Sequence, residues 1–379
     1  MKSITIAIDS FKGSLSSSTV AEVAEQSIHR ILPYCQVQKI SIADGGEGTV
    51  EALVDTLQGE IIEIEANDPL MRPIKARYGL VDGGTTAVIE MSAASGLPLL
   101  TPQERNPWLT TTYGTGEMIA DAIQRGARRL LIGIGGSATN DAGMGMLEAL
   151  GYRFYDADGA QLAGCGGNLS RVASIGKEEA LPALKECQIT VACDVKNPLY
   201  GPTGAAYVFA PQKGADAEMV ELLDLGLRNF ASVASAYSES EAELREGAGA
   251  AGGLGYCFCA LLGARLQSGI DMVLEAIDFA KRIESSDLII TGEGRIDSQT
   301  VMGKAPSGVL NAATAQGIPV VAIGGAVEPS EALQQSKFTA ILPIVAGPVS
   351  LDEAMREEVA AANVSRTVEQ IIKLLTLNR

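Results

Sequence analysis

The stretch Ser3-Ile-Thr-Ile-Ala-Ile-Asp-Ser-Phe-Lys12 lies near the start of the chain and decides how its fold begins. Isoleucine at every second position predicts a buried strand over Ser3–Ile8, and the polar residues that follow predict a loop. Thr19 and Glu22 form a capping box, which predicts the start of a helix that ends at Pro33. A strand, a polar loop and a helix in this order predict the first unit of a parallel α/β sheet.

The same pattern recurs near both ends of the chain. A strand at Val37–Ile42 and a helix at Thr49–Leu57 follow the first unit. Towards the C-terminus, short apolar strands alternate with helices, at Leu288–Thr291, Val320–Ile323 and Ala340–Leu342. We therefore expect an α/β fold in which both ends form one doubly wound parallel sheet of the Rossmann or flavodoxin type.

The middle of the chain has a different pattern. The alternation at Ile61–Ile64 is assigned to the first domain as its third strand, but Pro73–Leu80 and Thr85–Met91 predict a hairpin around Val81-Asp-Gly-Gly84. A hairpin introduces an antiparallel element into an otherwise parallel pattern. We expect residues 1–68 and 285–379 to form the doubly wound domain and residues 69–284 to form an inserted mixed α/β domain.

The composition limits the classes of partner. Lys and Arg number 29 against 46 Asp and Glu, so the formal net charge of the 379 residues is −17. This charge repels nucleic acid and anionic membranes, so we expect neither as a partner, and an anionic substrate needs a local cluster of cations. A single histidine, His29, excludes a multi-histidine metal site. Six cysteines without a C-x-x-C spacing predict reduced thiols and a cytoplasmic location.

Two loops near the N-terminus combine charged groups with glycine. The loop from Asp9 to Lys12 places a carboxylate, a hydroxyl and an ammonium group directly after the first strand. The loop Asp44-Gly-Gly-Glu-Gly-Thr49 places two carboxylates and several backbone amides at a helix start, where anions bind readily. The alternative is structural, with glycines that permit the turns and Asp44 as a helix cap.

Two later loops have a similar composition. The amides of Gly133–Asp141 could hold an anion, although the same glycines are compatible with a plain helix-capping turn. The loop Thr291–Thr300, followed by Lys304, contains several acids, bases and hydroxyl groups at a strand exit. This density favours a functional loop over a merely solvated one.

Two single residues are further candidates. Asp194 ends the apolar strand Ile189–Cys193 and could act as a base at the strand tip, or form a structural Asx turn. Arg72 could bind a carboxylate or phosphate with its guanidinium group, or be an ordinary surface arginine. The spacing Gly247-x-Gly-x-x-Gly252 matches a dinucleotide fingerprint, but the charged residues before it do not predict the strand that such a site requires.

Seven motifs together resemble one family, the bacterial glycerate kinases of the type that phosphorylates D-glycerate on the 2-hydroxyl group. They are Asp9-Ser-Phe-Lys12, Ile42-Ala-Asp-Gly-Gly-Glu-Gly-Thr49, Gly133-Ile-Gly-Gly-Ser-Ala-Thr139, Val191-Ala-Cys-Asp-Val195, Pro211-Gln-Lys-Gly214, Gly249-Ala-Ala-Gly-Gly253 and Thr291-Gly-Glu-Gly-Arg-Ile-Asp-Ser-Gln299. The resemblance runs nearly from end to end of the chain.

The resemblance implies two α/β domains with the active site in the cleft between them, and ATP and Mg²⁺ as cofactors. It implies that D-glycerate and ATP give 2-phospho-D-glycerate and ADP, in the breakdown of glycolate, glyoxylate or sugar acids. Three alternatives stay open: phosphorylation at the 3-position, a ligand-binding relative without turnover, and an NAD-dependent dehydrogenase of small acids. Monomer and homo-oligomer are equally compatible with the sequence.

Phosphoryl transfer needs a metal held by carboxylates, cations on the phosphates and a carboxylate near the attacking hydroxyl group. We expect Lys12 and Lys304 to neutralise phosphate charge, and Glu293 and Asp44 to hold Mg²⁺. Phosphate is expected to bind the amides and hydroxyls of Gly45, Gly46, Gly48, Thr49, Gly135, Gly136 and Ser137. The substrate is expected to contact Asp9, Ser10, Glu47, Arg72 and Arg295. As the catalytic base we prefer Asp194 to Asp297, because a strand-tip carboxylate of the inserted domain can face the phosphate loops of the other domain.

Overall fold

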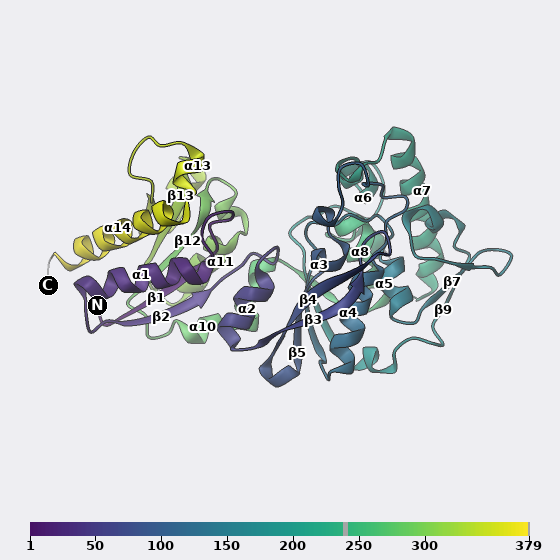
Figure 1. Ribbon diagram of the computed structural model, residues 1–379, viewed down its shortest axis with the longest axis horizontal. Coiled ribbons are helices and arrows are strands. Elements are labelled where there is room, and N and C mark those ends of the chain that lie inside the picture. Colours follow the sequence, from purple (N-terminus) through teal and green to yellow (C-terminus); the bar gives the residue numbers. More distant parts are fainter. Residues whose placement is uncertain (238–241, 378–379) are drawn as a thin grey trace. The chain divides into compact units, whose positions relative to one another are not determined.

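The computed structural model describes residues 1–237 and 242–377, in which the chain forms two compact units (Figure 1). Unit 1 contains Met1–Asp44 and Val273–Arg379, and unit 2 contains Gly45–Met272. The two ends of the chain therefore fold together. Along the chain, the boundaries between the units lie after residue 44 and before residue 273, whereas the sequence predicted limits near 68 and 285.

Unit 1 is built on a sheet of five parallel strands in the order β14-β13-β12-β1-β2. These strands are β1 (Ser3–Ile8), β2 (Gln36–Ser41), β12 (Leu288–Ile296), β13 (Val320–Val327) and β14 (Ala340–Pro343). Ile4 of β1 pairs with Val37 of β2 on one side and with Leu288 of β12 on the other. The predicted parallel sheet shared by the chain ends is thus confirmed. Its strand order changes direction beside β1, and sheets of this kind bind ligands at such a point, outside the carboxyl ends of the strands.

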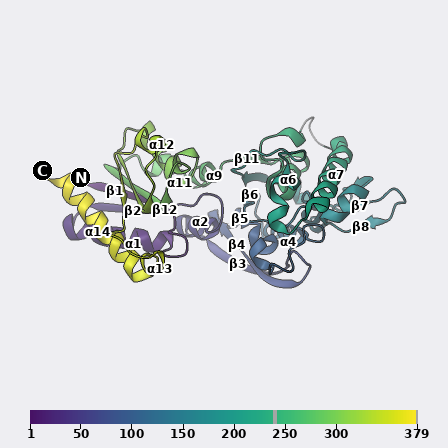
Figure 2. The same cartoon turned by 90° about the horizontal axis from the view of Figure 1, so that it is seen from above.

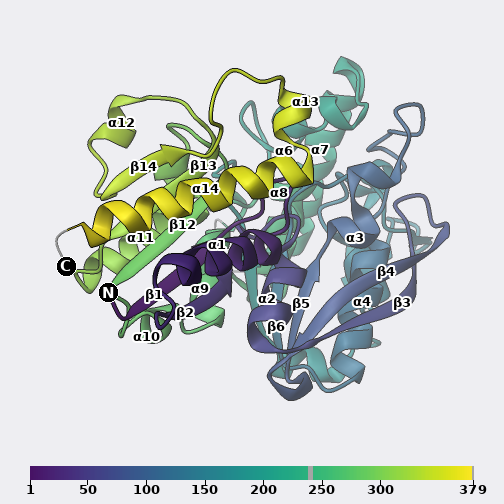
Figure 3. The ribbon, with the colours of Figure 1, turned by 60° about the vertical axis from the view of Figure 1, so that its left-hand side comes forward.

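Two long helices, α1 (Ser17–Ile31) and α14 (Glu357–Thr376), pack against each other over one face of this sheet (Figure 3). Helix α1 begins one turn earlier than predicted, because Ser16 is its N-cap and accepts a hydrogen bond from the Thr19 amide at 3.1 Å. The remaining helices of this part of the chain are α9 (Gly269–Ala276), which crosses the unit boundary, α10 (Phe279–Arg282), α11 (Ala305–Ala315), α12 (Glu331–Gln334) and α13 (Leu351–Ala354).

Unit 2 contains a six-stranded mixed sheet in the order β11-β10-β6-β5-β4-β3. Its strands are β3 (Glu60–Asn67), β4 (Pro73–Val81), β5 (Thr86–Glu90), β6 (Arg129–Gly133), β10 (Gln188–Ala192) and β11 (Arg265–Gln267). The last four run parallel, whereas β3, β4 and β5 are antiparallel neighbours. The predicted hairpin is confirmed, because β4 and β5 are joined through a short turn at Asp82–Gly84.

Strand β3 accounts for the difference at the first boundary. Ile61 of β3 pairs with Gly79 of β4, and Ile64 pairs with Ala76, in antiparallel register. The sequence analysis had placed this strand in the sheet of the chain ends, because alternating apolar residues do not show which sheet a strand joins. The connection of residues 68–72 is short, and a short connection joins antiparallel strands far more readily than parallel ones.

The rest of unit 2 covers and extends its sheet. A small sheet in the order β8-β7-β9 consists of β7 (Arg153–Tyr155), β8 (Gln161–Leu162) and β9 (Ser174–Gly176). The helices are α2 (Thr49–Leu57), α3 (Ser92–Ser95), α4 (Tyr113–Gln124), α5 (Met144–Ala149), α6 (Ala205–Phe209), α7 (Ala217–Ala234) and α8 (Ala250–Leu261). Figure 2 shows α6 and α7, which pack against each other. Within the described part of the chain, no helix is both long and apolar enough to cross a membrane.

Candidate active site

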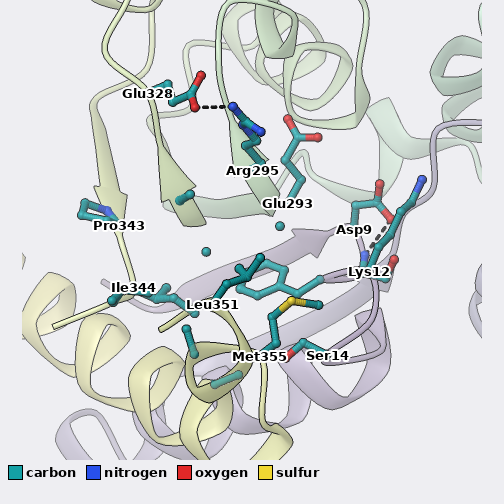
Figure 4. A pocket seen from close by; sticks show the side chains of 18 of the residues that line it. Asp9, Lys12, Ser14, Glu293, Arg295, Glu328, Pro343, Ile344, Leu351 and Met355 are labelled. Carbon is teal, nitrogen blue, oxygen red and sulfur yellow. Dashed lines mark hydrogen bonds and ion pairs between the residues drawn. The ribbon is translucent and has the colours of Figure 1, made fainter. Parts of the chain in front are cut away.

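Unit 1 contains a cavity of about 780 Å³ at the carboxyl ends of its parallel strands (Figure 4). Its polar side chains come from strand β12 and from the loops after β1, β2, β12 and β13, and those with a predicted function are Asp9, Ser10, Lys12, Asp44, Glu293, Arg295 and Lys304. The structure therefore brings together predicted site residues from both ends of the chain. A volume of this size is within the usual range of small-molecule sites.

Asp9 is the most buried carboxylate of this cavity. It follows β1 directly, and its amide donates to the Gly292 carbonyl at 3.0 Å, which fixes the loop against β12. Its side chain is only 5% exposed and accepts a hydrogen bond from the Ser10 amide at 2.6 Å. Burial, together with the nearby Asp44 and Glu293 carboxylates, raises the pKa of Asp9 from 3.8 to about 7. The site thus holds more negative charge than its own cations neutralise.

Glu293 projects from β12, beside Gly324 of β13. The Thr300 hydroxyl donates to Glu293 Oε1 at 2.6 Å, and Lys304 Nζ lies 3.8 Å from Glu293 Oε2. Burial raises the pKa of Glu293 above its usual value, although Thr300 and Lys304 act in the opposite direction. Lys304 Nζ is also 3.9 Å from Asp297 Oδ1, so this cation is shared between two carboxylates.

Two further ion pairs of the cavity are also long. Lys12 Nζ lies 3.7 Å from Asp44 Oδ2, and Arg295 Nε lies 3.9 Å from Asp297 Oδ2. Arg295 also donates to Glu328, which sequence reasoning did not single out. Separations near 4 Å are longer than direct hydrogen-bonded pairs, so the two lysines retain donors that can turn towards a ligand.

The carboxylates fit a hard divalent cation. Among the described residues, no three His, Cys, Asp or Glu side chains already form a metal-binding group. However, Asp44 and Glu293 are close enough to Asp9 to raise its pKa, so all three face one small region. Mg²⁺ is usually held by one or two carboxylates, with phosphate and water oxygens as the other ligands. The donor set therefore suits Mg²⁺ that arrives with a phosphate.

The glycine loop at residues 45–48 belongs to unit 2 and packs between the ends of two strands. Gly45 has a φ of +84°, and a Cβ added there would lie 2.7 Å from the Ala192 Cβ at the end of β10. A Cβ added to Gly133, at the end of β6, would lie 2.4 Å from the Gly45 carbonyl oxygen. Glycine at these positions thus permits close packing of backbone on backbone.

The amides at the start of α2 already bind an anion of the protein itself. The Val50 amide donates to Glu90 Oε1 at 3.0 Å, and the nearby amides of Gly48 and Thr49 help to lower the pKa of Glu90, although the Thr49 amide donates to the Gly46 carbonyl at 3.2 Å. The Thr49 hydroxyl donates to the Gly46 carbonyl at 2.7 Å. Glu90 would compete with a phosphate for the donors of this helix start, so the phosphate contacts of Gly48 and Thr49 stay a prediction.

The loop after β6 is held in a similar way. Lys213 is fully buried, and its Nζ donates to the Ser137 hydroxyl and to the Thr139 carbonyl, both at 2.6 Å. Burial lowers the pKa of Lys213 from 10.5 to about 7. Gly136 accepts the Leu97 amide at 2.8 Å, and Gly135 lies next to Gly46. The predicted phosphate contacts of Ser137 thus compete with an internal ammonium group.

Arg72 is engaged by two carboxylates of its own unit. Its Nε donates to Asp68 Oδ2 and its Nη1 to Glu104 Oε1, both at 2.6 Å. Asp68 is 2% exposed and also accepts the amides of Leu70 and Arg72. The arrangement orders the turn between β3 and β4, and the substrate contact of Arg72 stays a prediction.

Asp194 and Glu47 are both exposed on unit 2. Asp194 follows β10, and its Oδ1 accepts the Gly269 amide at the start of α9 at 3.1 Å. The prediction that Asp194 lies at a strand tip is met, while its role as the base stays a prediction.

The spacing from Gly247 to Gly252 has a packing function. In the described residues, a short 3₁₀ turn at Ala242–Leu244 precedes it instead of a strand. Gly252 has a φ of +68°, and a Cβ added there would lie 2.2 Å from the Thr139 carbonyl oxygen. The glycines let α8 approach the loop after β6, and the context of a dinucleotide site is missing.

Besides Glu328, sequence reasoning missed three features. Glu90 shows no local sign of binding the start of α2, and Lys213 lies in a motif, Pro211–Gly214, for which no role was assigned. The third is an apolar wall of the unit 1 cavity, which includes Phe11, Leu351 and Met355. Phe11 is far from Leu351 and Met355 in the chain, so only the folded structure brings them together.

Comparisons with known proteins agree with the geometry. The model of the glycerate kinase family matches residues 4–376. A glycerate kinase of Bacillus subtilis (strain 168) is 48% identical over 99% of this chain and 98% of its own length. The glycerate 2-kinase of Escherichia coli (strain K12) is 43% identical, also over 99% of this chain and 98% of its own length. A crystal structure described as glycerate kinase 2 from Salmonella typhimurium LT2 superposes with a TM-score of 0.92 at 42% identity, covering 100% of this chain and 99% of that one.

Proposed function

Because the chain belongs to the glycerate kinase family and is a kinase, we propose that it transfers the γ-phosphoryl group of ATP to the 2-hydroxyl group of D-glycerate. The products are 2-phospho-D-glycerate and ADP. The hydroxyl group loses its proton, its oxygen bonds to the γ-phosphorus, and the bond from that phosphorus to the β-phosphate oxygen breaks. The name of the Escherichia coli relative supports the 2-position. We place the reaction in the cytoplasm, in the breakdown of glycolate, glyoxylate or sugar acids.

The observation that carries this proposal is the charged end of the unit 1 cavity. Lys12 and Lys304 reach it from the loops after β1 and β12, and three carboxylates lie between them. Phosphoryl transfer needs little covalent chemistry from a protein, but it needs cations on the phosphates and a held metal. These residue types at one sheet edge meet that requirement without histidine.

Asp44 and Glu293 would hold Mg²⁺, with Asp9 as a third carboxylate beside them. When bound, the ion neutralises charge on the transferred phosphoryl group. Lys12 and Lys304 would orient the phosphates, because both can swing from their distant carboxylate partners towards an anion. Asp194 is the proposed proton acceptor for the substrate hydroxyl group, and Asp297 is the alternative.

Phosphorus NMR of the purified protein with MgATP and D-glycerate tests this function. We expect resonances of ADP and of 2-phosphoglycerate to grow together, with no growth when Mg²⁺ is chelated. A 3-phosphoglycerate resonance would leave the kinase activity intact and overturn the 2-position. Oxidation of a hydroxy acid with NAD, without ATP consumption, would overturn the proposal altogether.

A further inference from the structure

The unit 1 cavity has two chemically different halves. The charged half lies at the strand ends, with Asp9, Lys12 and Glu293 (Figure 4). The other half is lined by aliphatic and aromatic side chains, among them Leu351 and Met355. A three-carbon hydroxy acid is small and polar throughout, so it uses only the charged half. The ligand of the whole cavity must carry an apolar part next to an anionic part.

The apolar wall has exposed aliphatic side chains that a ligand can cover. Leu351 is 72% exposed and Val349 is 46% exposed, although both line a concave site, whereas Phe11 in the same lining is 4% exposed. Large aliphatic groups that remain accessible inside a pocket mark a surface that a ligand covers. The wall is also well supported. Ser350 caps α13, because its hydroxyl accepts a hydrogen bond from the Glu353 amide at 3.2 Å. Met355 packs against the loop after β1: a Cβ added to Gly13 would lie 2.9 Å from the Cε atom of Met355.

The corresponding donors of unit 2 are already used within the protein. Glu90 accepts the amides at the start of α2, and Lys213 donates to Ser137. A nucleotide triphosphate therefore finds accessible cations in unit 1, where Lys12 and Lys304 are 3.7–3.9 Å from their carboxylates. The apolar wall begins next to these cations, in the same cavity.

We infer that the unit 1 cavity is the nucleotide site, with the triphosphate at Lys12 and Lys304 and the adenosine part against Leu351, Met355 and Phe11. This inference rests on the proposed function, because it assigns the site of its phosphoryl donor. It places the nucleotide on the domain formed by the chain ends, instead of on the glycine loops of unit 2. The purine ring buries the exposed aliphatic groups, and the ribose spans the distance to the charged half.

The test separates the nucleoside from the phosphates. Binding of MgADP and of Mg-tripolyphosphate, which has no nucleoside, is measured by titration calorimetry for the parent and for Leu351→Asn. We expect Leu351→Asn to weaken MgADP binding about fivefold to tenfold, because part of a leucine side chain no longer packs on the base. Binding of tripolyphosphate should change by less than about twofold. Lys304→Met should weaken both ligands.

Leu374→Asn is the matched control, because Leu374 is 65% exposed on α14 and does not line the cavity. It should leave both affinities unchanged. Thermal unfolding of each variant checks that it folds, and Val349→Asn provides a second substitution in the wall. Unchanged MgADP binding in both wall variants, an equal loss for both ligands, or no MgADP binding by the parent would each overturn the inference. A parent that phosphorylates D-glycerate normally while its wall variants keep MgADP affinity would overturn the inference and leave the proposed function standing.

Discussion

The strand ends of the two units contain similar residue types in different electrostatic states. In unit 1, the pairs Lys12–Asp44 and Lys304–Glu293 are separated by 3.7 and 3.8 Å and open into a cavity. In unit 2, Glu90 accepts helix amides and Lys213 donates two hydrogen bonds of 2.6 Å. Glycine-rich loops with charged residues are thus not equivalent. The lysines of the unit 1 loops lie 3.7–3.9 Å from their carboxylates and can turn towards a ligand, whereas Lys213 of unit 2 is held by two short hydrogen bonds inside its own unit.

The largest expected effect concerns the proton acceptor. We place it at Asp194 on unit 2, so a catalytic Asp194 would show that unit 2 also has a charged group that acts on a ligand. Asp194→Asn keeps the size and the hydrogen bond to Gly269 but removes the charge, so kcat should fall by ~10²–10⁴ with little change in ATP affinity. Asp297→Asn should cost less, because Asp297 lies beside Lys304 and Arg295 as an ion-pair partner. Steady-state kinetics with D-glycerate measures both variants.

The reverse ranking would reassign the base. If Asp297→Asn abolished turnover and Asp194→Asn left kcat within about threefold, only ~0.6 kcal/mol of barrier, the proton chemistry would belong to the Thr291–Thr300 loop of unit 1.

The next effect concerns the metal. Glu293→Gln should raise the Mg²⁺ concentration for half-maximal rate by roughly tenfold, or about 1.4 kcal/mol of binding free energy, with part of the rate recovered at high Mg²⁺. The Thr300 hydrogen bond to the side chain can persist, so the change is mainly one of charge. Glu328→Gln is the control, since Glu328 lines the same cavity but pairs with Arg295. An identical Mg²⁺ requirement in both variants would remove Glu293 from the metal site.

The two units should also differ in the pH dependence of their stability. Between pH 4 and 7 folded Asp9 keeps a proton that the unfolded chain has lost, so unfolding releases it and the free energy of unfolding falls as pH rises. The shift from 3.8 to about 7 sets an upper bound of about 4 kcal/mol. Between pH 7 and 10.5 folded Lys213 is neutral while the unfolded side chain is charged, so the contribution of Lys213 to stability rises with pH.

Denaturant unfolding across this pH range, with Asp9→Asn and Lys213→Met, measures both contributions. Asp9→Asn should remove the acid-side slope, and Mg²⁺ should reduce it in the parent, because the ion offsets the crowded carboxylates. Slopes that persist in the variants would show that other groups cause them.

The sequence predicted the parallel sheet and the residues of the charged cavity better than it predicted which loop groups of unit 2 have hydrogen-bond partners inside the protein. Asp9, Lys12 and Asp44 lie in the loops after β1 and β2, and Glu293 lies in the C-terminal half of β12. The carboxyl ends of parallel strands share one edge, so their meeting follows from topology. Whether a loop amide has an internal acceptor depends instead on tertiary contacts such as that from Glu90, which is 40 residues from Val50. Local patterns do not contain that information.

A smaller effect tests the internal anion directly. Glu90→Ala should destabilise the protein by about 1–2 kcal/mol, because the amides at the start of α2 lose their acceptor, while Glu90→Gln keeps an acceptor oxygen and should cost less. Denaturant unfolding measures both. If phosphate stabilised Glu90→Ala more than it stabilised the parent, the vacated amides would bind an external anion, and the glycine loop would be a phosphate site masked by one carboxylate. Equal costs for the two substitutions would show that the hydrogen bonds to Glu90 contribute little.

The smallest expected effect is at Arg72, and it separates the substrate contact inferred from sequence from the structural role in the fold. Arg72 is partly exposed and bonds to Asp68 and Glu104, so Arg72→Ala should lower stability only slightly, as for other solvent-accessible ion pairs. Asp68 retains the amides of Leu70 and residue 72 as donors, which limits the cost of leaving that buried carboxylate without its guanidinium partner.

The KM of Arg72→Ala for D-glycerate should stay within about twofold of the parent value. Two carboxylates already neutralise the charge of the guanidinium group, so it attracts a substrate carboxylate only weakly. Arg295→Ala, measured in parallel, removes a cation that lines the unit 1 cavity and should raise that KM more. A tenfold rise in KM for Arg72→Ala alone, about 1.4 kcal/mol of lost binding, would show that a group satisfied inside unit 2 still binds substrate, and the distinction between open and internally paired charges would fail at this position.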